Sequence, residues 1–150
     1  MLILRRLENL LLSLWVGVMV GIGYIAAPVL FKVLDDRKLA GSLAGDMFYI
    51  VMLVGMILGG ILLLLRYREE SINLFRQWRG GILLLMLGLV AVSLFVLQPM
   101  IAEVKMSGIT EGSDNAKKFA MLHGISSLVY LLTVIFGCLL IFFGLRKTPG

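Results

Sequence analysis

Residues 47–65, MFYIVMLVGMILGGILLLL, form an apolar run without a single charged side chain. At a helical rise of about 1.5 Å per residue, a run of this length reaches about 28 Å, close to the thickness of the hydrocarbon core of a bilayer. Strands and soluble core helices rarely need so long an uninterrupted run. The stretch therefore predicts a transmembrane helix.

Three further runs of the same kind divide the rest of the chain. They are LLLSLWVGVMVGIGYIAAP (10–28), GILLLMLGLVAVSLFVLQPMI (81–101) and GISSLVYLLTVIFGCLLIFFGL (124–145). Of the 150 residues, 60% are hydrophobic and 15% are charged, whereas soluble domains carry about 25% charged residues. We predict an all-α integral membrane protein: a single domain, residues 1–150, folded as an antiparallel four-helix bundle with four transmembrane helices.

The first run follows a basic N-terminal segment, as the apolar part of a secretory signal peptide does. It is longer than the roughly 7–15 apolar residues of a signal peptide. In IAAPVLF (25–31), a proline would occupy the first position after the cleavage site. We therefore expect this run to stay in the protein as a transmembrane helix.

The charged residues between the runs predict how the chain lies in the membrane. With four helices, both termini and the middle loop share one side, which carries Arg5, Arg6, Arg66, Arg68, Arg76, Arg79, Arg146 and Lys147 against Glu8, Glu69 and Glu70. The other side carries Lys32, Arg37, Lys38, Lys105, Lys117 and Lys118 against Asp35, Asp36, Asp46, Glu103, Glu111 and Asp114. Segments rich in Lys and Arg stay in the cytoplasm. We therefore expect both termini to be cytoplasmic and the protein to lie in a bacterial inner membrane.

The net charge of +5 at pH 7 comes from residues that flank the apolar runs, and no basic patch is interleaved with aromatic residues. This pattern argues against a nucleic-acid partner. We expect the partners to be the lipid bilayer and either a second copy of the chain or another membrane protein. The one cysteine, Cys138, lies within an apolar run, which excludes an intrachain disulfide and a thiolate metal cluster.

Several polar segments and prolines predict the helix ends. Asp35 or Asp36 is expected to cap the helix that contains the second run, and SDNAKKF (113–119) to cap the fourth. Pro28 and Pro99 each lack a backbone donor, so each is expected to kink its helix or end it near the membrane surface.

The middle loop, RYREESINLFRQWRG (66–80), places Ile72, Phe75 and Trp78, or alternatively Leu74 and Trp78, at helical spacing. Arg76 and Arg79 lie on other faces of the same helix. This pattern predicts a short helix in the membrane interface, with its basic side toward anionic headgroups.

Small residues recur at four-residue intervals within the runs. They are Ser13, Gly17 and Gly21 in the first run, and Gly55 and Gly59 in the second. This spacing lets helix backbones approach closely in lipid. We expect these residues to pack helix against helix.

Polar residues near the hydrocarbon gather at the end of the bundle opposite the termini: Tyr24, Asp46, Gln98, Glu103 and His123. Three interpretations are open. They are interface residues solvated by headgroups and water, or they line a pocket for an ion or small molecule. In the third, His123 and the thioethers of Met100 and Met121 bind a soft metal such as Cu(I).

No enzyme motif is present: the chain has no HExxH, no CxxC, no P-loop and no glycine-rich dinucleotide turn. We therefore favour a protein that is not an enzyme. Haem held by two histidines is excluded within one chain because His123 is the only histidine. Haem held by a histidine and a methionine stays open without a pattern that favours it, and copper is the cofactor that the residues suit better.

Three segments resemble a known family: LWVGVMVGIGYIAAPVLF (14–31), QPMI (98–101) and FAMLHGISSLVYLL (119–132). The chain resembles the four-span membrane family catalogued as domain of unknown function 4149, whose eukaryotic relative is transmembrane protein 205. The resemblance implies a four-helix membrane protein of unresolved biochemistry. The relative's association with resistance to platinum drugs, and a distant architectural likeness to copper-resistance D type proteins, imply soft-metal handling. Carried onto this chain, the candidate residues are Tyr24, Gln98, His123 and Ser127.

Two functions follow as hypotheses. In the first, the protein handles a soft metal ion or small solute through the outer polar pocket. In the second, it is a non-catalytic membrane subunit or scaffold that packs against partner helices through its small residues.

Overall fold

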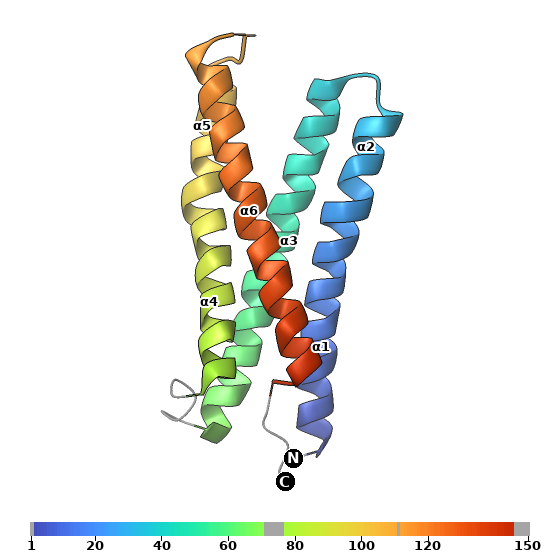
Figure 1. Cartoon of the computed structure of the whole chain (residues 1–150), viewed down its shortest axis with the longest axis vertical. Helices are drawn as coiled ribbons and strands as arrows, with labels where there is room; N and C mark the ends of the chain where they lie inside the picture. Colours follow the sequence, from blue (N-terminus) through green and yellow to red (C-terminus); the bar gives the residue numbers. More distant parts are fainter. Residues whose placement is uncertain (1, 71–76, 111, 146–150) are drawn as a thin grey trace.

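A computed structural model describes residues 2–70, 77–110 and 112–145. The elements are α1 (Leu2–Val20), η1 (Gly21–Ala26), α2 (Ala27–Val33), α3 (Arg37–Glu70), α4 (Trp78–Val92), η3 (Ser93–Leu97), α5 (Gln98–Met106) and α6 (Asp114–Phe143), where η1 and η3 are π-helical. The helices pack antiparallel (Figure 1). We call the end that holds the start of α1 and the end of α6 the proximal end, and the opposite end the distal end.

The predicted all-α bundle of four membrane helices is confirmed. Four continuous helices are long and apolar enough to cross a membrane: Ile3–Val33, Arg37–Arg68, Trp78–Met106 and Asp114–Phe143. Each begins before its predicted run, because polar turns extend it beyond the apolar core. The last helix ends two residues before its predicted end, where Gly144 takes a φ of 71° that favours glycine.

The predicted caps are present at both distal helix starts. The Asp36 carboxylate, rather than that of Asp35, accepts hydrogen bonds from the backbone N–H groups of Lys38 (2.8 Å) and Leu39 (3.2 Å). The Ser113 hydroxyl accepts one from Ala116 N at 3.2 Å. Each bond satisfies an otherwise unpaired donor in the first turn of a helix.

The surface helix predicted in the middle loop involves Ile72 and Phe75, which lie outside the described residues. Its third member, Trp78, is the first residue of α4. The Trp78 ring packs edge-on against Phe143 at a centroid distance of 5.6 Å. Trp78 therefore contributes to contact between α4 and the end of α6.

The two prolines do not end their helices. A π-helical turn precedes each of them, and the backbone N–H groups of Ala27 and Gln98 donate to the carbonyls of Ile22 and Ser93, five residues back. The wider turn accommodates the carbonyl that a proline ring would otherwise strike. The helical course therefore continues to Val33 and Met106.

The proximal half of the bundle is closed by tight packing around Trp15, which is 1% exposed. A Cβ at Gly55 would lie 2.9 Å from Trp15 Cε2, and one at Gly59 would lie 3.0 Å from Trp15 Cη2. On the other side, Gly137 of α6 packs against Val16. The absence of side chains at these glycines thus leaves the space that the Trp15 indole and the Val16 side chain occupy.

The small residues predicted to pack therefore fall into two groups. Gly55 and Gly59 of α3 meet α1 within this chain. Ser13 and Gly17 lie on an exposed face of α1. Apart from the adjoining backbone, no described atom lies within 4 Å of a Cβ built at Gly17 or Gly21. A packing role for the α1 residues therefore stays a prediction about contacts with another molecule.

We predict that Gly55→Ala destabilises the bundle by about 1–3 kcal/mol, the usual cost of overpacking a filled core. The added methyl would strike the buried indole of Trp15. The matched control is Gly60→Ala in the same helix, where no described atom lies within 4 Å of the new Cβ. Thermal unfolding in detergent measures both variants. Equal melting temperatures for the two would contradict the packing described.

A buried arginine connects α3 to the end of α6 at the proximal end of the bundle. Arg66 of α3 is fully buried, and its guanidinium donates to the Leu145 carbonyl and, at 3.4 Å, to Gln77 Oε1. Arg79 donates to the Phe143 carbonyl at 3.3 Å. Because these carbonyls are at the end of α6, where no helical partner remains, the arginines fix that end to α3 and α4. A second fully buried charged residue, Glu8, belongs to α1.

Candidate functional site

A cavity of about 980 Å³ occupies the distal half of the bundle. In Figure 1 the distal ends of α5 and α6 lie apart from those of α2 and α3, and residues of all four membrane helices line the space between them. The volume is at the upper end of the about 300–1,000 Å³ typical of ligand pockets. This cavity is the candidate functional site.

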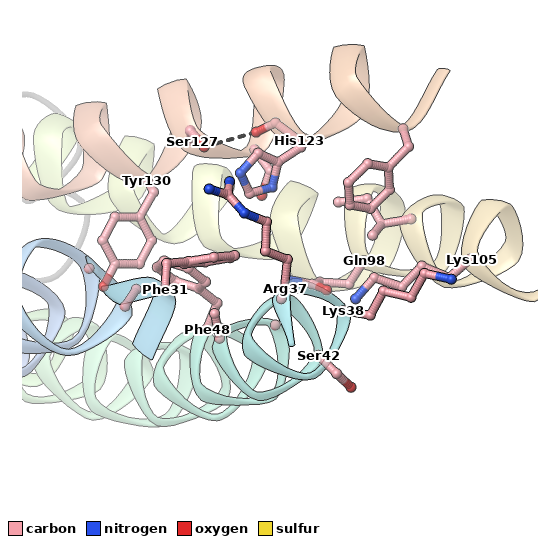
Figure 2. Close-up of a pocket in the computed structure, with 18 of the residues that line it drawn as sticks. Phe31, Arg37, Lys38, Ser42, Phe48, Gln98, Lys105, His123, Ser127 and Tyr130 are labelled. Carbon is pink, nitrogen blue, oxygen red and sulfur yellow. Dashed lines mark hydrogen bonds between the residues drawn. The ribbon is translucent and has the colours of Figure 1, made fainter. Parts of the chain in front are cut away.

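Four of the predicted site residues line this one cavity: Tyr24, Gln98, His123 and Ser127. They come from the first, third and fourth membrane helices. Figure 2 shows Gln98 on α5 and His123 on α6, with Tyr130 farther along α6. Antiparallel packing therefore brings together residues that are almost a hundred positions apart in sequence.

The other predicted site residues lie outside the distal cavity. Asp46 is exposed and lines a neighbouring hollow of about 560 Å³, together with Gln98 and Lys105. Glu103 is exposed and lines neither space. Met100 and Met121 are also exposed and line neither.

The predicted soft-metal ligands are thus not grouped around the cavity. Of the three, only His123 lines it. Within residues 2–70, 77–110 and 112–145, no group of three or more His, Cys, Asp or Glu residues is arranged to hold a metal ion. His123 therefore has no such cluster to join.

His123 lies in the third turn of α6 and is exposed toward the cavity. Its ring stacks on Phe119 at a centroid distance of 5.9 Å and an interplanar angle of 10°. The Ser127 hydroxyl donates to the His123 backbone carbonyl at 2.9 Å. Because this serine bonds its own helix, it is not arranged as a nucleophile activated by the imidazole.

The cavity is also lined by three basic residues, Arg37, Lys38 and Lys105. From the sequence, these residues were interpreted only as charges that flank the membrane helices. In Figure 2 the Arg37 side chain extends from the start of α3 toward His123, while Lys105 lies toward the distal end. Lys105 Nζ is 3.3 Å from the position of a Cβ at Gly45, so it reaches from α5 to α3.

No described residue lining this cavity is Asp or Glu. Among the described residues, no carboxylate lies within ion-pair distance of Arg37, Lys38 or Lys105. The cavity therefore has an excess of positive charge beside an apolar interior, where charge interactions are stronger than in water. The helical spacing of the α3 residues could have predicted this side of the cavity. One face of α3 carries Arg37, Gly41, Gly45, Phe48 and Met52 at intervals of three or four residues.

Aromatic residues close the inner end of the cavity. Tyr130 packs edge-on against Phe48 at a centroid distance of 5.0 Å, and its hydroxyl donates to the Met19 carbonyl at 2.6 Å. The Tyr130 ring fills the space beside Gly23, where a Cβ would lie 2.6 Å from Tyr130 Cε1. Only glycine leaves room for the ring at this position.

Ser93 adds an unpaired polar group to the cavity wall. It is 1% exposed, and its hydroxyl has no hydrogen-bond partner among the described residues. Ser93 is also the first residue of the π-helical turn η3 and lines the cavity. Since buried polar groups are nearly always paired, this hydroxyl is available to a polar atom of an occupant.

The cavity lining combines hydrogen-bond donors with apolar surface. Cationic groups and the Gln98 amide provide hydrogen-bond donors, while aromatic rings provide apolar surface. The described lining residues include no nucleophile paired with a base and orienting acid. The chemistry offered is recognition of an anionic group attached to, or accompanied by, apolar surface.

Comparison with known proteins places the chain in a family. Residues 10–110 match the family described as "Domain of unknown function (DUF4149)". A protein of Aquifex aeolicus (strain VF5) named "Uncharacterized protein" is 32% identical over 122 residues, which cover 81% of this chain and 82% of that relative. No solved structure matches the chain. The match covers η1, Pro28, η3 and Pro99, and the chain belongs to the DUF4149 family.

Proposed function

We propose that this membrane protein binds a small anionic solute in its distal cavity. The observation that carries the proposal is the set of three basic side chains, with no Asp or Glu among the described lining residues. A cavity with one sign of charge and apolar walls raises the local concentration of ions of the opposite sign. His123, Gln98 and Tyr24 add hydrogen-bonding groups at the same site.

The proposal includes an orientation. Both termini are cytoplasmic in a bacterial inner membrane, so that the distal cavity faces the opposite side. The arginine-rich proximal flanks support this orientation, because basic segments are retained in the cytoplasm. The solute would then reach the cavity from the outer side of the membrane.

Handling of a soft metal, and with it likeness to transmembrane protein 205, has weaker support. A metal cation would enter beside three positive charges, and of the predicted ligands only His123 lines the cavity. Cu(I) binding that is lost in His123→Ala would favour the metal hypothesis over the anion hypothesis.

We predict that a compact photoactivatable anion labels the cavity. The probe is benzophenone-4-carboxylate, applied to the protein in nanodiscs of zwitterionic lipid, with cross-linked residues mapped by mass spectrometry. Labels are expected on Phe31, Phe119 and His123, which line the cavity, and excess benzoate should remove them.

The matched controls for this probe are its neutral hydroxymethyl and cationic aminomethyl analogues. Because only the carboxylate pairs with Arg37, Lys38 and Lys105, labelling of the cavity by either analogue should be at least about tenfold lower. Equal labelling by the cationic analogue would refute an anion site.

The second candidate function is that of a membrane subunit or scaffold. The exposed face of α1 that carries Ser13 and Gly17 supports it, because small residues at this spacing suit close helix contact in lipid. A stable complex with another membrane protein on native gels, combined with no labelling of the cavity, would favour this function.

A further inference from the structure

The distal cavity is longer than a compact anion requires. On α3 its lining runs from Arg37 to Met52, which at about 1.5 Å per residue is about 22 Å. On the third membrane helix it runs from Lys105 to Ser93, about 18 Å by the same rise. The cavity is therefore an elongated slot whose length exceeds half of the roughly 30 Å thickness of the hydrocarbon.

The chemistry of the lining changes along this length. Arg37, Lys38 and Lys105 belong to the first turn of α3 and the last turn of α5, at the distal mouth, and the Arg37 side chain extends inward from there toward His123 (Figure 2). Farther in along α3 and α6, the lining contains Phe48, Met52 and Tyr130. An occupant that satisfies both regions has a charged end and a long apolar body.

The slot is closed at its inner end. Tyr130 and Phe48 meet there edge-on, and the packed core around Trp15 and Met86 fills the proximal half. A solute that enters from the mouth has no continuous path to the proximal end in this structure. The geometry is that of a binding slot and not of a pore.

Ser93 provides a second observation that points to an occupant. Its buried hydroxyl lacks a partner among the described residues, and it lies five residues below Gln98, deeper than the basic mouth. In a largely apolar slot, such a group gains a hydrogen bond from a polar atom of the occupant or from water that accompanies it.

We infer that the slot binds an anionic amphiphile, with its acidic headgroup among Arg37, Lys38 and Lys105 and its apolar chain directed toward Phe48, Met52 and Tyr130. The inference rests on the proposed function and adds a chain to the anion. The same chemistry belongs to a single-chain fatty acid and to a two-chain anionic phospholipid, one chain of which would enter the slot.

The test uses a sixteen-carbon carboxylate with a diazirine at the end of its chain, incorporated into nanodiscs that contain the full-length protein. The experiment measures which residues are labelled and not how tightly the probe binds. An apolar chain gains little affinity when it moves from lipid into an apolar slot. We expect labels on Phe48, Met52 or Tyr130 at the closed end. The same chain with a terminal alcohol in place of the carboxylate should leave these residues unlabelled.

A pair of glycine variants tests whether the slot itself is occupied. Gly41 lines the slot, and a Cβ there would meet only Phe31 Cζ, at 3.8 Å, so Gly41→Leu narrows the slot with little strain on the fold. It should lower labelling of the closed end by about tenfold. The control Gly17→Leu adds the same side chain to the exposed face of α1 and should leave the labelling unchanged.

Competition identifies the source of the amphiphile. Protection by unlabelled hexadecanoate alone assigns a single-chain acid, and protection by phosphatidylglycerol assigns a membrane lipid; both support the inference. Long-chain labels confined to the lipid-facing surface, together with cavity labelling by benzophenone-4-carboxylate, overturn the amphiphile but retain the anion site. Equal labelling of the closed end by the alcohol overturns the anionic amphiphile, and labelling by benzophenone-4-carboxylate then decides the anion site separately.

Discussion

Replacing Arg37, Lys38 and Lys105 by glutamine in one variant is expected to lower labelling of the cavity by benzophenone-4-carboxylate by at least about tenfold. A hydrogen bond to a charged group contributes about 1.5–3 kcal/mol when desolvated, and tenfold in affinity corresponds to about 1.4 kcal/mol. Because these three residues are exposed to solvent, each contributes less than that value. The combined loss of affinity from the three substitutions is still expected to exceed a factor of ten.

The matched control removes three charges from the same end of the bundle without touching the cavity. Lys32, Lys117 and Lys118 are exposed and do not line it. Their replacement by glutamine should change labelling by less than about twofold, because exposed charges that do not line the cavity interact with its occupant only through water and salt, which weaken the interaction. An equal loss in both triple variants would assign the effect to the general surface potential and not to the cavity.

The second large effect is expected at the proximal end, where Arg66→Met should destabilise the protein by about 3 kcal/mol. Methionine keeps the apolar volume but removes the donors to the Leu145 carbonyl and Gln77. Breaking a buried charged interaction by removing one partner typically costs about 3–5 kcal/mol, and each unsatisfied group adds to this cost. Thermal unfolding in detergent should show a fall in Tm on the order of 10 °C, since about 1 kcal/mol shifts Tm by about 2–4 °C at this size.

Arg68→Met provides the control for Arg66→Met. Arg68 is two residues farther along α3 and is exposed, so the same substitution there removes a charge without opening a buried network. Its Tm should remain close to that of the wild type. If both variants lose stability equally, the proximal hydrogen bonds do not fix the end of α6.

The fold could be predicted from the sequence because the pattern that identifies each membrane helix lies within a single segment of the chain. Each apolar run matches the thickness of a bilayer, and the backbone of such a run must satisfy its hydrogen bonds as a helix. The caps at Asp36 and Ser113 were accessible for the same reason, since each involves residues two or three positions away. The prolines were less informative, because a π-helical turn before each one lets the helix continue.

The candidate site was accessible only in part. Tyr24, Gln98, His123 and Ser127 share one cavity, whereas Asp46 and Glu103 lie at a similar level outside it. Depth along a helix follows from sequence position, but the direction in which a side chain points depends on how the helix is rotated in the bundle. The basic mouth was missed because Arg37, Lys38 and Lys105 look like ordinary flanking charges.

The sequence by itself determined that four apolar helices form an antiparallel membrane bundle, because length and hydrophobicity are properties of each segment alone. The tertiary structure decided that Gly55 and Gly59 receive Trp15 while Gly17 faces outward, and that Arg66 is buried while Arg68 is exposed. It also decided that three positive charges and an apolar slot share one cavity. These outcomes depend on helix rotation and separation, which are fixed by contacts between segments distant in sequence.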